Sequence, residues 1–219
     1  MIKATYVDHM GTDLSVVNAA RVSFAKHREA LGSVTVGEYT VSLVLHDTDK
    51  KLIKYLAKHK HTSPFGHAFA SFHVKAPVFV ARQLVKHKFL RWNEISRRYV
   101  DDEPEFYVPD VWRGKSADKK QGSEGVVTTK SNVALLNHAA LLCYTSLLAD
   151  GVAPEQARMV LPQSTMTEWY WSGSLDAFAD MCKLRCASDT QAETQKVAWD
   201  ISLKMEELFP VSWVALRDE

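Results

Sequence analysis

Residues 82–99 read RQLVKHKFLRWNEISRRY and contain six lysines or arginines but only one glutamate, an excess of five positive charges. The whole chain carries a formal net charge of only +1. Large apolar side chains are interleaved with these cations, namely Leu84, Val85, Phe89, Leu90, Trp92 and Ile95. A solvated basic face does not need so many apolar neighbours. The pattern therefore favours a positively charged binding site for an anion, surrounded by packed apolar side chains.

The spacing in this segment predicts a helix that begins near Pro77 and runs to about Leu90. On such a helix Gln83, Lys86 and His87 share one face, because positions three and four apart are neighbours. Residues 93–98 would follow as a loop rich in amide, carboxylate, hydroxyl and guanidinium groups. Guanidinium forks grip phosphate, and amides and carboxylates recognise the N–H and C=O edges of a polar ring. The segment thus predicts a site for an anion with a planar polar ring, and a solvated basic face is the alternative.

Other residues whose side chains could take part in catalysis or ligand binding lie outside this segment. Arg185 stands near the end of a predicted helix, where a cation also interacts favourably with the helix dipole. Cys182 and Cys186 are spaced i, i+4, but two thiols without further ligands are more simply packing residues. The histidines of HKHTSPFGH (59–67) resemble a ligand cluster, yet no acidic residue lies among them, so we expect no metal site.

Composition narrows the class of protein. The chain has 219 residues, of which 46% are hydrophobic and 24% charged, as is typical of a globular domain with a sizeable core. The near-neutral net charge argues against bulk binding of nucleic acid or membrane. The first residues lack the pattern of a signal peptide, and no apolar run is long enough to span a bilayer. With three cysteines that form no disulfide framework, we expect a cytoplasmic protein.

The remaining elements indicate an α+β fold in one domain over residues 1–219, with a mostly antiparallel sheet and a majority of helix. Alternation predicts strands at 68–76 and 166–174, and a short strand is expected at 105–109. Residues 25–46 are ambiguous and could form a hairpin around Gly37-Glu38. Helices are predicted at 47–59, 131–151, 174–185 and 190–209. Residues 113–130, rich in glycine, serine and lysine, are the best candidate for a mobile loop.

In segment 82–99 and in several other segments, the chain resembles the flavin-dependent thymidylate synthases. Their signature is an Arg-His-Arg triplet, seven residues and a serine, usually within NE-x-S-x-RY. Here the triplet is Lys86-His87-Lys88, the serine is Ser96, and NEISRRY fits without a gap. MGTDLSVVNAARVSF, HKHTSPFGH, FHVKAPVFVARQ, GVAPEQARMVLP and LRCASDTQAETQ also resemble family segments, in the family's order.

The resemblance implies an enzyme that methylates dUMP to dTMP. It would take the carbon from 5,10-methylenetetrahydrofolate and a hydride from FAD that NADPH has reduced. It also implies a homotetramer whose active sites are shared between subunits. Two other functions stay open at this stage: an RNA- or DNA-binding module that uses residues 82–98 with Trp92 as a stacking residue, and a metal hydrolase that uses the histidines.

The resemblance also implies site residues. The dUMP site would consist of Gln83, Leu84, Val85, Lys86, Glu94, Ile95, Ser96, Arg97, Arg98, Arg158 and Arg185. The FAD site would consist of Ser63, Lys86, His87, Lys88, Glu94, Ser174, Asp176 and Asp180, with Ser23 and His61 as further members. Arg185 is the expected catalytic residue, because a fixed cation beside uracil favours negative charge on the ring.

The sequence departs from the family pattern at several of these positions. Lys86 and Lys88 replace two arginines, which keeps the charge but loses the bidentate fork. Arg91 stands where a small residue is common and would replace part of that function. Ser174 and Asp176 stand where asparagine and arginine are expected in the flavin site.

Overall fold

The computed structural model describes residues 1–36, 39–117 and 122–218. The first half of the chain contains β1 (Lys3–Met10), α1 (Asp13–Arg21), β2 (Gly32–Val36), β3 (Tyr39–Val44), α2 (Asp47–Lys58), β4 (Phe69–Pro77), α3 (Val78–Leu84) and β5 (Arg91–Glu94). The second half contains β6 (Arg113–Lys115), β7 (Ser123–Val126), α4 (Val133–Ala149), α5 (Pro154–Ala157), β8 (Met166–Ser174), α6 (Leu175–Arg185), α7 (Ala192–Leu208) and α8 (Pro210–Arg217). Three short 3₁₀ turns lie at Val22–Phe24, Ser63–His67 and Arg158–Val160.

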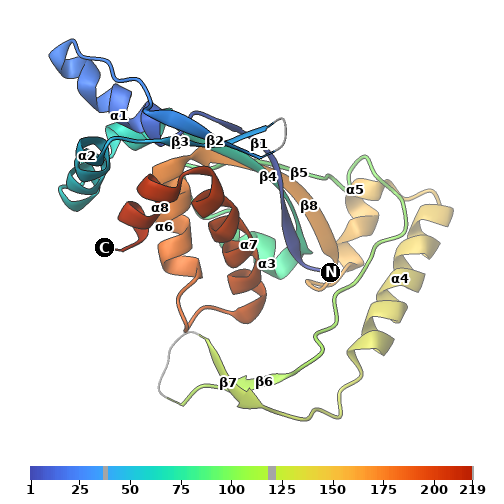
Figure 1. Cartoon of the computed structure of the whole chain (residues 1–219). Coiled ribbons are helices and arrows are strands. Elements are labelled where there is room, and N and C mark those ends of the chain that lie inside the picture. Colours follow the sequence, from blue (N-terminus) through green and yellow to red (C-terminus); the bar gives the residue numbers. More distant parts are fainter. Residues whose placement is uncertain (37–38, 118–121, 219) are drawn as a thin grey trace.

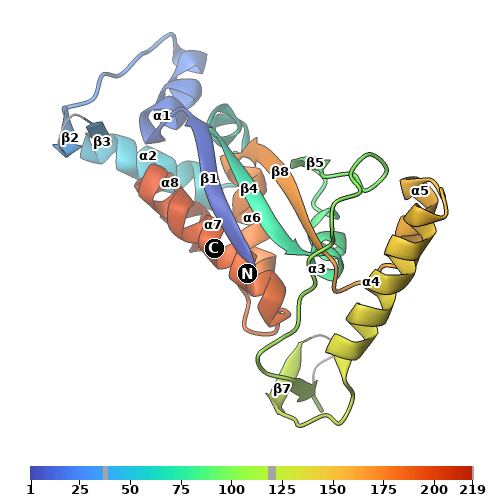
Figure 2. The same cartoon turned by 90° about the vertical axis from the view of Figure 1, so that its right-hand side faces the viewer.

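A four-stranded antiparallel sheet in the order β1-β4-β8-β5 forms the centre of the molecule. Along β4 the side chains of Ala70, Phe72, Val74 and Ala76 are buried, and those between them are partly exposed. Because successive side chains of a strand point to opposite faces, one face of the sheet is covered. Figures 1 and 2 show α6, α7 and α8 packed against that face. The α+β class with an antiparallel sheet is thus confirmed.

Large aromatic rings fill the space between sheet and helices. Trp171 pairs with Phe72 across the strands and meets Phe178 of α6 edge to face, with ring centroids 5.8 Å apart. Trp169 stacks on Trp92 of β5 at 4.3 Å. Fully burying one such side chain contributes about 1.5–3 kcal/mol. These rings therefore fix the position of the edge strand β5, which carries Glu94.

The charged segment 82–99 folds differently from the prediction. The helix ends at Leu84 rather than near Leu90, the chain turns through 85–90, and Arg91–Glu94 form β5. The reason is packing: Leu90 is buried, and Trp92 stacks on Trp169, which a continuing helix would prevent. Gln83 and Lys86 therefore do not lie on one helical face.

Three other segments can be compared with expectation. Strands β2 and β3 form the hairpin predicted within 25–46, and its turn at Gly37-Glu38 lies outside the described residues. Residues 105–109 form only an isolated bridge, between Phe106 and Thr165. The described part of 113–130, expected to be a mobile loop, contains the paired strands β6 and β7. In the part of the chain that the structure describes, no helix is long and apolar enough to cross a membrane.

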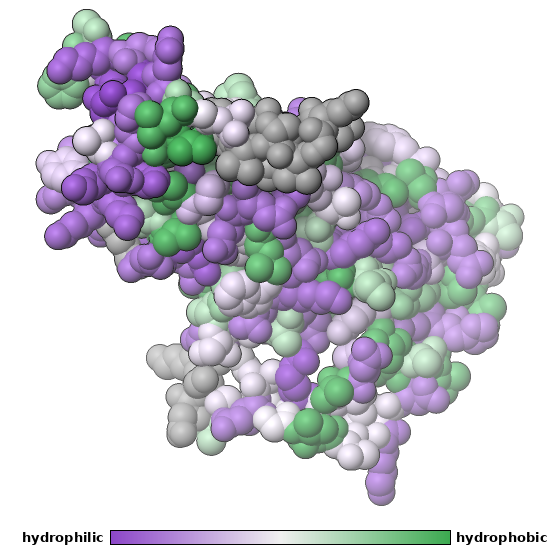
Figure 3. Space-filling model, viewed as in Figure 1, coloured by the Kyte–Doolittle hydropathy of each residue, from purple (hydrophilic) through white to green (hydrophobic). Residues whose placement is uncertain are grey.

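Helix α4 stands to one side of the sheet–helix body (Figures 1 and 2). Leu135, Leu136 and Leu142 are 64%, 61% and 56% exposed on it, whereas Asn137 and Tyr144 are buried. Figure 3 shows hydrophobic surface at this end of the molecule. An apolar helix with so little covered surface is typical of an interaction surface.

Candidate active site

A cavity of about 670 Å³ lies where α3, the start of α7 and the segment 107–113 meet. Gln83 and Arg185, two of the predicted dUMP residues, both line it. The other walls come from Phe79, Tyr107, Pro109, Val111, Trp112, Arg113, Gly122, Ser123, Val133, Ser164, Thr190, Gln191 and Glu193. The structure thus brings together two residues that are about 100 positions apart in the sequence.

Gln83 is held by hydrogen bonds at both ends of its amide. Its Nε2 donates to Gln191 Oε1, and its Oε1 accepts from the hydroxyl of the fully buried Thr194 at 3.1 Å. Each amide atom has capacity for one more bond. Gln83 can therefore offer a donor and an acceptor to a ligand without losing its orientation.

Arg185 connects the cavity to the turn after α3. Its Nε donates to Nε2 of His87 over 3.2 Å, so this ring nitrogen carries no proton. Burial, and then the charge of Arg185, lower the pKa of His87 to about 4. Burial also lowers the pKa of Arg185. At neutral pH the pair is thus a guanidinium cation oriented by a neutral imidazole.

Glu94 is fixed on β5 although it is exposed. Its Oε1 accepts from the Thr167 hydroxyl at 2.7 Å and its Oε2 from Trp92 Nε1 at 3.1 Å. Both contacts hold the carboxylate in place on the edge strand.

The residues after Glu94 form a separate group. Arg98 donates from Nε to Ser96 Oγ at 3.2 Å. Arg97 donates to the backbone oxygen of Asp102 at 2.6 Å. Ile95 and Arg97 line a second cavity of about 140 Å³, away from Gln83 and Arg185. Leu84 is fully buried and lines neither described cavity, and Val85 is exposed in the turn.

Arg158 lies on the 3₁₀ turn after α5, beside α4. Its Nε donates to the Glu155 backbone oxygen at 3.2 Å, and the side chain is exposed. It lines neither described cavity. A single chain therefore does not bring Arg158, Arg98 and Arg185 to one place.

Several candidate flavin residues meet where β8 runs into α6. Leu175 N donates to Ala68 O at 2.9 Å, which joins the start of α6 to the turn that carries Ser63. On β8, a Cβ on Gly173 would lie 2.3 Å from Leu90 Cδ2, so only glycine lets the 85–90 turn approach this closely. Ser63, Ser174 and the turn with Lys86, His87 and Lys88 therefore border one region.

The acidic side chains at this place can accept hydrogen bonds. Oδ1 of Asp176 is buried and has no hydrogen-bond partner among the described residues. Asp180 is exposed one turn further along α6. Lys86 and Lys88 are exposed on the neighbouring turn. The region thus offers acceptors for hydroxyl or amino groups and cations for phosphates, a donor set that fits a flavin dinucleotide.

Ser23 and His61 lie at opposite ends of α2, a helix of 12 residues that spans about 18 Å. His61 is exposed beside Tyr55 and His59, with ring centroids 6.1 and 6.3 Å away. Among the described residues, no three His, Cys, Asp or Glu gather as metal ligands. Ser23 is exposed in the 3₁₀ turn after α1.

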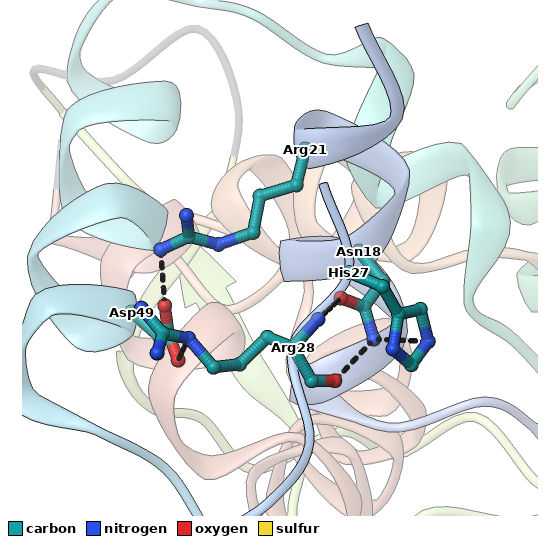
Figure 4. A network of polar contacts seen from close by, with 5 residues as sticks. All are labelled: Asn18, Arg21, His27, Arg28 and Asp49. Atoms are coloured by element: carbon teal, nitrogen blue, oxygen red, sulfur yellow. Dashed lines mark hydrogen bonds and ion pairs between the residues drawn. The ribbon is translucent and has the colours of Figure 1, made fainter. Parts of the chain in front are cut away.

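A network of polar contacts fixes the turn that carries Ser23 (Figure 4). The buried carboxylate of Asp49 accepts from Arg21 and pairs with Arg28 Nε at 3.3 Å. The Asn18 side chain accepts from Arg28 N at 2.8 Å and donates to Arg28 O at 3.0 Å. We call these contacts the Asp49 clamp. They hold both ends of the segment 21–28, so Ser23 is presented on a fixed turn.

Sequence reasoning missed the residues at the start of α7. Gln191, Glu193 and Thr194 contribute three of the polar groups in or behind the cavity wall. The signal was the polar run TQAET at the beginning of a predicted helix, which lies in a segment that resembles the family but was given no site residue after Arg185. The cysteines behave as expected: Cys182 and Cys186 are buried, and Cys182 donates to Ala198 O at 3.5 Å.

The chain is similar to known proteins over most of its length. The chain is 41% identical to a flavin-dependent thymidylate synthase of Thermus thermophilus, over 97% of this chain and 74% of the relative. It is 37% identical to another of that name from Thermosipho melanesiensis, over 93% and 85%.

A solved structure is also similar, that of a UMP/dUMP methylase, PolB, from Streptomyces cacaoi bound with 5-Br dUMP. Its TM-score is 0.79 at 31% identity, covering 100% of this chain and 95% of that one. The model of the thymidylate synthase complementing protein family matches residues 5–211. This chain therefore belongs to the thymidylate synthase complementing protein family.

Proposed function

We propose that this chain, as one domain, is a flavin-dependent thymidylate synthase that methylates dUMP to dTMP. The carbon would come from 5,10-methylenetetrahydrofolate, and FAD reduced by NADPH would supply the hydride. The observation that carries the proposal is the Arg185–His87 contact. It joins the cavity lined by Gln83 to the turn whose lysines border the candidate flavin region.

Arg185 has the properties that the methylation of uracil requires. Uracil C5 becomes a better nucleophile when negative charge can develop on the ring, and a preoriented cation beside the ring stabilises that charge. His87 orients the guanidinium through Nε, which leaves both Nη groups available. Gln83 offers a free donor and acceptor on the same cavity wall. These groups would bind the pyrimidine and hold it during carbon transfer.

The flavin would lie in the region bordered by Ser63, Ser174 and the 85–90 turn. Asp176 Oδ1 lacks a partner among the described residues and would accept a hydroxyl or amino hydrogen of the cofactor. Lys86 and Lys88 would act as point charges towards phosphate or carbonyl groups, where an arginine would act as a fork. Reduced FAD supplies the hydride when it is bound.

A homotetramer would complete the site. Arg158 and the Ser96–Arg98 group lie away from the cavity in one chain, although the family resemblance assigns all of them to dUMP. The exposed leucines of α4, the helix that Arg158 follows in the chain, offer a surface for a second copy of the chain. Association through this surface would carry Arg158 of one subunit to the cavity of another.

The direct test is flavin binding followed by nucleotide titration. We expect the purified protein to bind FAD, and dUMP to perturb the flavin absorption spectrum. UMP belongs in the same titration, because the similar structure is described as a UMP/dUMP methylase. A protein that takes up no FAD on reconstitution would refute the proposal. A response to RNA or DNA without flavin binding would favour the basic nucleic-acid module instead.

A further inference from the structure

The first turn of α7 contacts three different walls of the cavity. Gln191 and Thr194 hold the amide of Gln83 on α3. Gln195 donates to Cys186 O and Ala187 O, at 3.4 and 2.8 Å, in the segment that directly follows Arg185. Glu193 contacts the third wall, residues 107–113, which we call the strap. A single helical turn thus sets the distances between all three walls.

Glu193 makes both side-chain hydrogen bonds by which the strap reaches α7. Its Oε1 accepts from the Tyr107 hydroxyl at 3.3 Å and from Nη2 of Arg113. The two contacts come from the two ends of the strap, and Arg113 also donates to Ser123 Oγ at 3.0 Å. Between them Pro109, Val111 and Trp112 line the cavity. Backbone hydrogen bonds also hold the strap, from Tyr107 N to Ser164 O at 2.8 Å and from Val127 N to Trp112 O at 2.9 Å. The carboxylate of Glu193 is its side-chain link to α7.

The charge of Glu193 is suited to this contact. The residue is only 7% exposed, and burial alone would raise its pKa. Its hydrogen bonds to backbone N–H and to Arg113 offset this, and the pKa lies below the ordinary value. Burial and the negative charge of Glu193 raise the pKa of Tyr107 to about 12, so this hydroxyl keeps its proton and donates. At neutral pH the Glu193 carboxylate therefore accepts, through Oε1, from both Tyr107 and Arg113.

A stabilising role alone explains this arrangement poorly. A buried ion pair often contributes no more stability than apolar residues of similar size, because both charges lose their hydration. What such a pair supplies is a defined geometry. Here the defined geometry is that of the cavity wall formed by residues 107–113. The arrangement is also not optimised for stability, because Oε2 of Glu193 is buried without a hydrogen-bond partner among the described residues.

We propose that Glu193 is a positioning residue that holds the strap against α7 and thereby sets the width of the cavity for the substrate nucleotide. The inference rests on the proposed function, because it takes the cavity to be the dUMP site. Glu193 acts through Tyr107 and Arg113 and does not itself take part in the chemistry. Its loss should loosen substrate binding and leave the flavin region, which lies beyond the Arg185–His87 contact, unaffected.

The test compares Glu193→Gln and Arg113→Ala with the control Glu207→Gln, which removes an exposed carboxylate paired with Lys204 on the same helix. We expect Glu193→Gln and Arg113→Ala each to raise the Kd for dUMP by at least about tenfold, since misplacing a binding wall by about 1 Å is costly. The Kd for FAD should change by less than about twofold. Hydrogen exchange of residues 107–113 should become faster in both variants and stay normal in Glu207→Gln.

The double variant shows whether the two residues act as one unit. If they do, Glu193→Gln combined with Arg113→Ala should bind dUMP no more weakly than the weaker single variant. Arg113 is 30% exposed, so Arg113→Ala keeps the test decisive if Glu193→Gln does not fold. An unchanged dUMP Kd, or equal losses of FAD and dUMP affinity, would overturn the inference. A wild-type protein that binds FAD but no dUMP would overturn the inference and the proposed substrate together, whereas normal wild-type binding confines any failure to the inference.

Discussion

The contact between Arg185 and His87 joins two residues that sequence reasoning assigned to different ligands. The resemblance implied dUMP for Arg185 and FAD for His87, and no local pattern indicates that the two touch. The contact arises because the chain turns after Leu84 and brings His87 back towards the end of α6. The residue types could thus be predicted from the sequence, but their pairing could not, because it depends on where a helix ends.

His87 gives the protein a defined pH dependence. Its pKa falls from 6.5 to about 4 in the folded chain, because burial and Arg185 disfavour its charged form. Between these values the unfolded chain binds a proton that the folded chain does not, so stability falls as the pH drops from 6.5 towards 4. The expected result is a melting temperature that declines less with acid in His87→Asn than in the wild type.

The test depends on how much the acid-induced fall in melting temperature differs between the wild type and His87→Asn. Glu105 and Glu193, whose pKa values are lowered, also lose their contribution in acid, but they do so in both proteins. Identical pH profiles of the melting temperature for wild type and His87→Asn would contradict the neutral, buried state of His87.

Arg185→Ala should damage chemistry more than folding. Loss of a cation near a helix end costs about 0.3–1 kcal/mol through the dipole. Removal of a preorganised charge at the reacting ring costs about 10²–10³ in rate. The measurement is single-turnover dTMP formation with pre-reduced enzyme, alongside a thermal melt that verifies folding. Arg185→Lys is the matched variant, and it should rescue little because a lysine lacks the fork. A normal rate constant for Arg185→Ala would remove this residue from the mechanism.

Elements with a strong period were predictable, and short elements bounded by packing were not. In strands β4 and β8, buried positions alternate with partly or fully exposed ones over eight of the nine residues, so their pattern is unambiguous. Strand β5 has four residues between cationic segments, and its strand conformation comes from pairing with β8 and from the Trp92–Trp169 stack. Helix α8, which the sequence analysis did not assign, begins at Pro210 directly after α7.

The start of α8 is held by a contact between residues that are far apart in the sequence. The carboxylate of Asp13, at the beginning of α1, accepts from the backbone N–H groups of Val211 and Ser212, both at 2.9 Å. Such a contact satisfies free donors at a helix start and is worth about 0.5–2 kcal/mol. Because the partners are almost 200 residues apart, no local pattern predicts it.

The Asp49 clamp allows a prediction at the level of one element. Asp49→Asn leaves Arg21 and Arg28 beside a neutral group. Breaking a fully buried pair in this way costs about 3–5 kcal/mol, and the cost here is smaller because these arginine side chains are 20% and 34% exposed to water. We therefore expect a clearly lower melting temperature and faster hydrogen exchange in residues 21–28. Asp47→Asn is the control, because Asp47 lies on the same helix with an exposed pair to Lys50. Equal melting temperatures for the two variants would contradict the clamp.

On the scale of the whole molecule, one chain contains the cavity but not all the residues that the family resemblance assigns to it. Arg158 and the Ser96–Arg98 group do not line the cavity that Gln83 lines, and α4 exposes three leucines. The sequence predicted the helix but could not show that three of its leucines stay exposed among the described residues of the chain. Only the fold reveals that this surface is open to a second copy.

Leu142→Glu should therefore disturb assembly more than folding. A charge in the middle of an apolar contact is costly to desolvate, so we expect a lower oligomeric mass by light scattering and loss of dTMP formation. Leu203→Glu is the control, since Leu203 is 60% exposed on α7. A variant that keeps the wild-type mass would show that α4 is not the surface of association.

The central claim is that this chain transfers a one-carbon unit to dUMP in a flavin-dependent reaction. The most direct measurement incubates the FAD-reconstituted protein with dUMP, NADPH and 5,10-methylenetetrahydrofolate labelled with ¹³C at the methylene carbon. We predict dTMP that carries the label in its methyl group, and none when FAD is omitted. Unlabelled product, or equal product formation without flavin, would contradict the account.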